Sequence, residues 1–529
     1  MACLIIGILA NSAHSVIAFL ATASIGALWS CTSPDFGSHS ILDRLTQIEP
    51  KILLADNAVF YNGREHDALA KVATVAEGIK SLEKVIVFPY VKSHSMDLSS
   101  IPKRSGLMSK ALMISITSDE FLSVPKLGLE FTYVPFDHPL IILYSSGTTG
   151  LPKPIIHAAG PLLLQLKKEH VLHCDFTSKD VFFQFTTCAW MMWPWLVGGL
   201  SAGATILTYD GSPFRPTPLS LWELCDQEGV TAFGTSAKYI GSLEQADIYP
   251  SMVLPFIANS DNHLNLSKLR LIMSTGSVLP PSSFEYVYKA FPSKVQLSSI
   301  TGGTDICSLF GAPCPTTPVY IGEIQVRALG MAVSAFDDTG KPVPINHPGE
   351  LVCIRPFPIQ PVGFWGKDGQ EKYRNSYFAR FPGIWHHGDY VAITQTGGML
   401  MLGRSDSILN PAGVRFGSAE IYNVLLAKFP DIADSVCVGQ QKAGDADERV
   451  LLFVKMEQGK ELTPELVAKV KKAIREDLSA RHVPSVLVEC PDIPVCLLGD
   501  VLMTLVHGKR EEDRGRCQKY CMWESCASE

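Results

Sequence analysis

The stretch "LYSSGTTGLPKP" covers residues 143–154 and begins with the last two residues of the apolar run Leu140–Tyr144. Such a run predicts a buried strand, and the residues after it predict a phosphate-binding loop, because hydroxyls and a lysine donate hydrogen bonds to anions and glycines allow close backbone approach. The stretch does not fit the G-x-x-x-x-G-K-[ST] pattern of a Walker A loop. The alternative is an ordinary Ser/Gly-rich turn. The candidate phosphate ligands are Ser145, Ser146, Gly147, Thr148, Thr149, Gly150 and Lys153.

Outward from this loop, short β-branched runs alternate with helical patterns along most of the chain. This alternation predicts an α/β fold with mostly parallel sheets. The strands that we expect include residues 84–89, 140–144 and 204–209, and the helices include residues 161–170 and 281–290.

The first thirty residues, "MACLIIGILANSAHSVIAFLATASIGALWS", are strongly apolar. We interpret them as a buried strand followed by an apolar helix over Ala13–Leu28. The alternative is a targeting peptide, but a basic first segment is absent and neither apolar piece reaches the ~20 residues of a membrane span.

The sequence pattern changes near Arg404. Two amphipathic helical patterns there, at 417–429 and 463–480, alternate with two strand patterns, at 434–440 and 448–456. This predicts a small, mobile α+β domain at 404–494, after a large domain of α/β subdomains at 1–403 and before a divergent tail at 495–529.

Composition limits the class of protein. A chain of 529 residues is long enough for about three domains. The net charge of −7 argues against a nucleic-acid-binding protein. The 14 cysteines are scattered, mostly among apolar neighbours, which predicts reduced thiols in a cytoplasmic protein. The tail cysteines Cys517, Cys521 and Cys526 lack the spacing of a metal site.

Four further motifs follow the loop in a fixed order: "SSITGGTDI" at 298–306, "GEL" at 349–351, "WHHGDY" at 385–390 and "GRSDSILNPAGVRFGSAEIY" at 403–422. Together with the loop, they resemble the adenylate-forming (acyl-CoA synthetase) superfamily. The finer resemblance is to its acetoacetate–CoA ligases, from about residue 8 to residue 494. It implies attack of a carboxylate on the α-phosphate of MgATP, then displacement of AMP by the thiol of CoA after the C-terminal domain rotates.

The resemblance also implies roles for single residues. Loop residues 145–153 would hold the β- and γ-phosphates, with Lys153 acting in catalysis, and Asp305 would hold Mg²⁺ where the superfamily usually has Glu. An N-cap is the alternative for Asp305. The implied nucleotide ligands are Gly276, Ser277, Val278, Thr304, Asp389, Arg404 and Arg415, the hinge residue is Asp406, and the implied CoA contacts are Gly413 and Arg475.

The acyl pocket can be argued from side-chain size. Related acetyl-CoA synthetases have a bulky Trp where this chain has Gly302, so a longer acid has room here. Trp190, Met191 and Met192 would line the same pocket, since Met adapts to irregular shapes and Trp offers an N–H to a keto oxygen. Acetoacetate fits this reasoning. Plain core packing is the alternative for "WMMWPW".

The chain departs from the superfamily at both ends. It starts more than a hundred residues late, and the stretch after Pro494 reads "VCLLGDVLMTLVHGKREED" where a Gly-Lys pair is expected. If the chain is aligned with the superfamily without a gap, Gly499-Asp500 takes the place of the Gly-Lys pair, and the acidic side chain would impair adenylation. If residues are inserted in the alignment, Lys509 is the catalytic lysine. A ligase for another short acid and a nucleotide-binding pseudoenzyme therefore remain as alternatives.

Overall fold

The structure is a computed structural model of the chain. It describes residues 3–102, 108–111, 128–145, 151–251, 264–291, 294–405, 408–409, 416–440, 448–457 and 459–490. Several predicted site residues lie outside the described residues, and for Arg404 only the backbone is described. Those outside are Ser146, Gly147, Thr148, Thr149, Gly150, Asp406, Gly413, Arg415 and Lys509, together with the tail 495–529.

The N-terminal part forms an eight-stranded sheet whose strand order is β20-β9-β8-β2-β1-β3-β6-β7. The six strands from β8 to β7 run parallel, β9 is antiparallel to β8, and β20 is antiparallel to β9. The strands are β1 (Leu4–Ile8), β2 (Leu28–Thr32), β3 (Ile52–Asp56), β6 (Lys84–Phe88), β7 (Met108–Ala111), β8 (Pro139–Ser145), β9 (Lys153–Ala158) and β20 (Gly363–Phe364), with helices α1 (Ala13–Ser24), α2 (Ser38–Leu45) and α3 (Leu69–Gly78).

The opening strand and helix are confirmed, but the predicted end of the helix is wrong. Helix α1 ends at Ser24 rather than Leu28, because Gly26 takes a positive φ of 68° and Leu28 already pairs with Leu4 in the sheet. Sheet pairing here overrides the helical propensity of an apolar segment.

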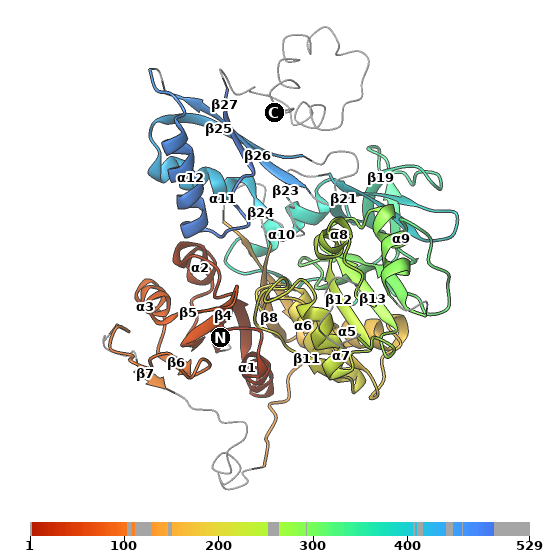
Figure 1. The fold of residues 1–529 in the computed structure, drawn as a ribbon, viewed down its shortest axis with the longest axis horizontal. Helices are drawn as coiled ribbons and strands as arrows, with labels where there is room; N and C mark the ends of the chain where they lie inside the picture. The colour runs from red at the N-terminus through yellow and green to blue at the C-terminus, as the bar shows by residue number, and fades with distance from the viewer. Residues whose placement is uncertain are drawn as a thin grey trace, which may run out of the picture.

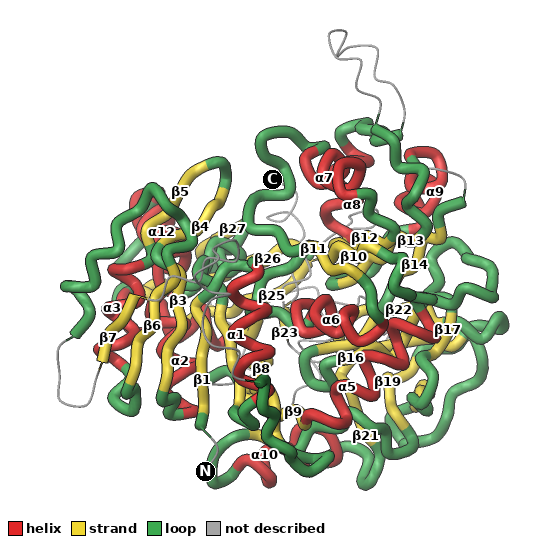
Figure 2. Tube along the Cα trace, turned by 90° about the horizontal axis from the view of Figure 1, so that it is seen from below, coloured by secondary structure: helices red, strands yellow, loops and turns green. Residues whose placement is uncertain are grey.

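A second sheet has five parallel strands in the order β11-β10-β12-β13-β14. Figure 2 shows it beside the first sheet, with β7, β6, β3 and β1 on one side and β10 to β14 on the other. Its elements are β10 (Val181–Gln184), β11 (Thr205–Leu207), β12 (Ala232–Ser236), β13 (Leu271–Thr275), β14 (Gln296–Ser299), α5 (Ala159–Lys168), the π-helix η2 (Glu169–His173), α6 (Met192–Gly198), η3 (Gly199–Ala202), α7 (Ser220–Glu228), α8 (Ala237–Gln245) and α9 (Pro281–Ala290).

Antiparallel strands follow and complete the large part of the molecule. They are β15 (Thr301–Gly303), β16 (Ser308–Ala312), β17 (Val326–Arg327), β18 (Val333–Phe336), β19 (Gly349–Cys353), β21 (Trp385–Ile393) and β22 (Met399–Arg404), with α10 (Gly369–Phe378) between β20 and β21.

The C-terminal unit, meaning the described residues from 408 to 490, has its own core. Four of its elements match the sequence prediction within a few residues: α11 (Ser418–Lys428), β25 (Ile432–Gln440), β26 (Arg449–Met456) and α12 (Pro464–Asp477). The strands β23 (Ile408–Leu409), β24 (Phe416–Gly417) and β27 (Val486–Glu489) were not predicted. It lies over α2 in Figure 1, and α12 contacts α2.

Two wider expectations can be compared with the described residues. Among them, no helix combines the length and the apolar character that crossing a membrane requires. Eight of the described cysteines are buried, free thiols, as their apolar neighbours predicted: Cys31, Cys174, Cys188, Cys225, Cys307, Cys353, Cys437 and Cys490.

Candidate functional site

A cavity of about 600 Å³ opens at the carboxyl ends of strands β10, β12, β13 and β14. Ligands bind at this edge of parallel sheets, because the loops that follow the strands meet there. Its walls bring together several predicted site residues from distant parts of the sequence. These are Trp190, Met191, Met192, Gly276, Ser277, Val278, Gly302, Thr304 and Asp389.

The predicted acyl residues form one part of this wall. Trp190 and Met191 lie in the turn before α6, Met192 is the first residue of that helix, and Gly302 lies on β15. A Cβ on Gly302 would lie 1.9 Å from the backbone oxygen of Ser308, on the paired strand β16. Glycine at 302 therefore permits the close approach of the two strands.

The predicted nucleotide segment directly follows β13. Gly276 has a positive φ of 92°, which glycine adopts without strain, and the turn that it makes leads Ser277 and Val278 along the cavity wall. Thr304 lines the same cavity from the loop after β15.

Asp305 lies at the junction of three segments. Its carboxylate accepts hydrogen bonds from Ser145 Oγ, at 3.3 Å, and from the hydroxyl of Tyr377. The neighbouring Thr304 carbonyl accepts a hydrogen bond from Nε2 of the fully buried His157, at 3.0 Å. Burial lowers the pKa of His157 to about 4, so its imidazole is neutral at physiological pH. The first residue of the predicted phosphate loop is thus joined to the predicted metal ligand.

Lys153 begins β9 on the other side of the loop. Its ammonium group donates to Ser376 Oγ at 3.1 Å and lies 5.8 Å from the centre of the Phe364 ring. It does not belong to the described lining of the cavity, which includes neither β9 nor α10.

Asp389 is 2% exposed on β21, and His387 Nε2 lies 3.6 Å from its Oδ2. The backbone of Asp389 pairs with that of Arg404 on β22, so the two predicted ribose ligands are neighbours in one antiparallel ladder.

Glu350 of the "GEL" motif connects the strands of this ladder to their neighbours. Glu350 is buried and accepts hydrogen bonds from His386 at 2.9 Å, Arg380 at 2.6 Å and Ser405 at 2.6 Å. Burial opposes ionisation of Glu350, but the hydrogen bonds from His386 and Ser405, together with the charges of His386 and Arg380, lower the pKa of the carboxyl. One carboxylate therefore ties β19 to β21 and to the residue after Arg404.

Arg475 is exposed on α12 and lies outside the described lining of the cavity. The C-terminal unit contributes Glu448 and Arg481 to that lining instead. The guanidinium carbon of Arg481 lies 5.8 Å from the centre of the Trp190 ring, which fits a cation–π contact. No local pattern in the sequence predicts this contact, because nearly 300 residues separate the two side chains.

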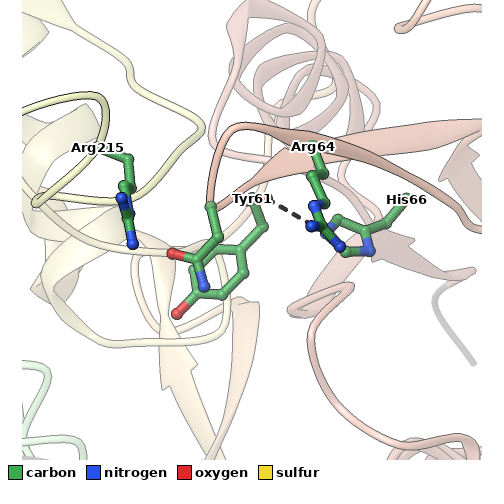
Figure 3. Close-up of a pocket in the computed structure, with 5 residues that line it drawn as sticks. Tyr61, Arg64, His66 and Arg215 are labelled. Carbon is green, nitrogen blue, oxygen red and sulfur yellow. Dashed lines mark hydrogen bonds between the residues drawn. The ribbon is translucent and has the colours of Figure 1, made fainter.

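A second pocket, of about 510 Å³, adjoins the cavity and shares Tyr61, Asn62 and Arg215 with it. Figure 3 shows Arg64 and His66 next to each other on one side of Tyr61 and Arg215 on the other side. His66 Nε2 donates to the Tyr61 carbonyl at 3.2 Å. The pocket thus combines two guanidinium groups and an imidazole, which suits an anionic ligand.

Sequence reasoning missed this second pocket, although a signal for half of it was present. Asn62-Gly63 joins the strands β4 (Ala58–Tyr61) and β5 (Arg64–Asp67), and both turn residues have positive φ. An Asn-Gly pair between alternating residues is a strong hairpin signal. Arg215 comes from the loop after β11 and reaches the pocket only through the tertiary fold.

Comparisons with known proteins agree with this arrangement. The chain matches the family of AMP-binding enzymes over residues 5–358. It is 48% identical to an acetoacetyl-CoA synthetase of Gallus gallus over 97% of this chain and 74% of that protein. A malonamoyl-CoA synthetase of Penicillium aethiopicum is 46% identical over 94% of this chain and 68% of that protein. In structure, the chain resembles the acetoacetyl-CoA synthetase of Streptomyces lividans, with a TM-score of 0.69, 36% identity, and coverage of 97% of this chain and 74% of that one.

Proposed function

Since the chain belongs to the AMP-binding enzyme family, and within it to the acetoacetyl-CoA synthetases, we propose that it is an ATP-dependent acetoacetate–CoA ligase. The reaction converts acetoacetate, ATP and CoA into acetoacetyl-CoA, AMP and pyrophosphate. The observation that carries this proposal is the single cavity that joins the acyl wall of Trp190 and Gly302 to the nucleotide segment at Gly276 and to Asp389.

The first half-reaction needs no side chain as a nucleophile. The carboxylate of acetoacetate attacks the α-phosphate, a P–O bond breaks, and pyrophosphate leaves. The protein contributes by positioning the reactants and by stabilising negative charge. We assign phosphate binding to the loop from Ser145 to Lys153, and a cation at 153 suits the developing charge.

A divalent cation fits the same place. Mg²⁺ prefers oxygen ligands and remains bound to substrate phosphates, and the oxygens of Asp305 and Ser145 lie together here, with the Tyr377 hydroxyl next to them. When bound, the ion supplies charge neutralisation for the leaving pyrophosphate. The neutral His157 fixes the Thr304 carbonyl beside it, which orients the segment that carries Asp305.

For the nucleoside, we propose Gly276, Ser277 and Val278 at the adenine and Asp389 at the ribose hydroxyls. Asp389 is buried at the cavity wall, and a buried carboxylate gains from accepting hydrogen bonds from a ligand. Arg404, Arg415 and the hinge role of Asp406 remain predictions.

For CoA, the basic pocket of Tyr61, Asn62, Arg64, His66 and Arg215 supports a site for its phosphates. It adjoins the acyl cavity, so a ligand with a phosphorylated end and a reactive thiol can reach from one to the other. Gly413 and Arg475 remain predicted CoA contacts.

The acyl part of the cavity favours a short acid with a polar group. The acids named by the two kinds of curated relative, acetoacetate and malonamate, both carry a carbonyl at C3. We propose acetoacetate as the substrate, in the cytosol, where the buried free thiols remain reduced. The product would then supply lipid synthesis.

The test is acetoacetate-dependent release of pyrophosphate from MgATP, first without and then with CoA. We expect release well above that of a Lys153→Ala variant, and formation of acetoacetyl-CoA when CoA is added. Release at the level of Lys153→Ala, with ATP still binding, would identify a nucleotide-binding pseudoenzyme. A larger rate with another short acid would instead identify a ligase for that acid. Loss of the acetoacetate-dependent rate in Lys509→Ala would identify that residue as the catalytic lysine.

A further inference from the structure

The acyl cavity contains side-chain oxygens that make no hydrogen bond within the described part of the protein. Three of them are Gln184 Oε1, Thr187 Oγ1 and Thr235 Oγ1, and a further one, Ser277 Oγ, belongs to the predicted nucleotide segment; all four residues line the cavity. Thr235 is 1% exposed and Gln184 is 2% exposed. Because a buried polar atom without a partner is costly, such atoms at a cavity wall indicate a ligand that supplies the partner.

Gln184 and Thr235 lie on two neighbouring strands, and Thr187 lies in the loop after β10. Gln184 ends β10 and pairs with Gly234 on β12, and Phe185 N–H donates to the Gly234 carbonyl at 2.9 Å. A Cβ on Gly234 would lie 1.9 Å from Gln184 Oε1, so the amide group packs closely over the glycine. Thr235 follows that glycine directly.

The acyl wall is continuous with this region. The Trp190 N–H donates to the Thr187 carbonyl at 3.2 Å, within the turn that carries the wall residues. Thr187 is therefore tied by the backbone to the wall that was assigned to the acyl group from size and shape, and Gln184 and Thr235 line the same cavity.

The chemistry of the three atoms differs. An amide oxygen only accepts hydrogen bonds, whereas a threonine hydroxyl also donates. The C3 carbonyl of a 3-keto acid only accepts, and a saturated acid of the same length has no acceptor there. Gln184 Oε1 is therefore the wrong partner for the carbonyl, and a threonine hydroxyl is the right one. Of the two, Thr235 has its whole side chain enclosed.

We propose that Thr235 is a specificity-determining residue, whose hydroxyl donates a hydrogen bond to the C3 carbonyl of the acid and so selects a 3-keto acid over a saturated one. The proposal rests on the proposed function, because it assumes that the acid occupies this cavity. It goes further by naming the side chain that distinguishes acetoacetate from butyrate.

The experiment compares acetoacetate and butyrate in the wild type and in Thr235→Val, which replaces the hydroxyl by a methyl group of similar size. Affinities are measured by calorimetry with α,β-methylene-ATP present, and specificity constants by pyrophosphate release. We expect Thr235→Val to weaken the binding of acetoacetate by about tenfold, which is the value of one net hydrogen bond. The affinity for butyrate should stay the same or increase. Thr235→Ser should retain the preference for acetoacetate.

A matched control is available on the next strand. Ser274 on β13 is fully buried and its hydroxyl also has no partner among the described residues, but it is not part of the described lining. Ser274→Ala should change the affinity for neither acetoacetate nor butyrate.

Three results would overturn the proposal. In Thr235→Val, the affinities for acetoacetate and butyrate could fall equally, or neither affinity could change. The third result is that Thr187→Val, but not Thr235→Val, loses the preference for acetoacetate. The same holds if the wild type binds butyrate as tightly as acetoacetate. Absence of pyrophosphate release from the wild type would contradict the proposed function, while the calorimetric comparison would still decide the role of Thr235.

Discussion

Replacing Glu420 by Gln should weaken the attachment of the C-terminal unit to the rest of the protein. Glu420 Oε2, on α11, lies 3.4 Å from Arg44 Nη2, on α2, and the two side chains are 7% and 10% exposed. The pair is the charged centre of a contact in which the Gly37 N–H also donates to the Leu478 carbonyl at 3.0 Å. Gln has the shape of Glu, so the change removes mainly the charge.

The magnitude follows from the burial of the pair. Removing one partner of a buried ion pair costs about 3–5 kcal/mol, because the other charge stays behind without compensation. Arg44 retains its hydrogen bonds to the Ser40 carbonyl and hydroxyl, which places the expected loss near the lower end, at about 3 kcal/mol. His482 Nε2, 3.6 Å from the same carboxylate, also loses its acidic neighbour.

A double-mutant cycle separates the pair from these other effects. Glu420→Gln, Arg44→Met and the double variant are unfolded in urea, and the coupling free energy is calculated. We expect about 1–3 kcal/mol, as for other side chains in direct contact.

The chain provides a matched exposed pair as a control. Lys460 Nζ lies 3.0 Å from Asp431 Oδ1, and these side chains are 54% and 48% exposed. Such pairs contribute about 0–1 kcal/mol, so Asp431→Asn should have little effect. A coupling below about 0.5 kcal/mol for Arg44 and Glu420, no larger than that of the exposed pair, would refute the reasoning.

Three further outcomes follow from single features of the structure. Gly302→Ala should lower the urea midpoint markedly and reduce pyrophosphate release, because its Cβ would overlap the Ser308 carbonyl; unchanged stability would show that β15 and β16 separate easily. Arg64→Ala should raise the KM for CoA about tenfold and leave CoA-independent pyrophosphate release unchanged, whereas an equal loss in both would rule out a CoA-specific role. Burial lowers the pKa of both His157 and His170 to about 4, so below pH 6.5 the unfolded chain binds protons that the folded one does not, and stability falls as the pH decreases towards 4. Near pH 5.5 the two histidines together should cost about 3 kcal/mol relative to pH 7.5, and His170→Gln should remove about half of this difference in urea unfolding.

The sequence was sufficient for elements whose signal is local. The apolar run before the predicted phosphate loop became β8, residues 281–290 became α9, and the two helices and two strands predicted for the C-terminal unit appear within a few residues of their predicted limits. Periodicity and strand propensity act over a few neighbours, so they can be read without the fold. The end of α1 was missed because the pairing of Leu28 with Leu4 depends on a strand more than twenty residues away.

The motifs by themselves indicated the chemistry, since hydroxyls, glycines and a lysine after a strand are the means of holding phosphates, and their order along the chain identified the family. The tertiary structure alone decided which side chains share a cavity. Arg481 reaches Trp190 from the C-terminal unit, Arg215 joins Arg64 across two sheets, and Thr235 lines the same cavity as Trp190. These contacts depend on how the sheets and the C-terminal unit pack against each other, which is set by burial over the whole chain rather than by any local pattern.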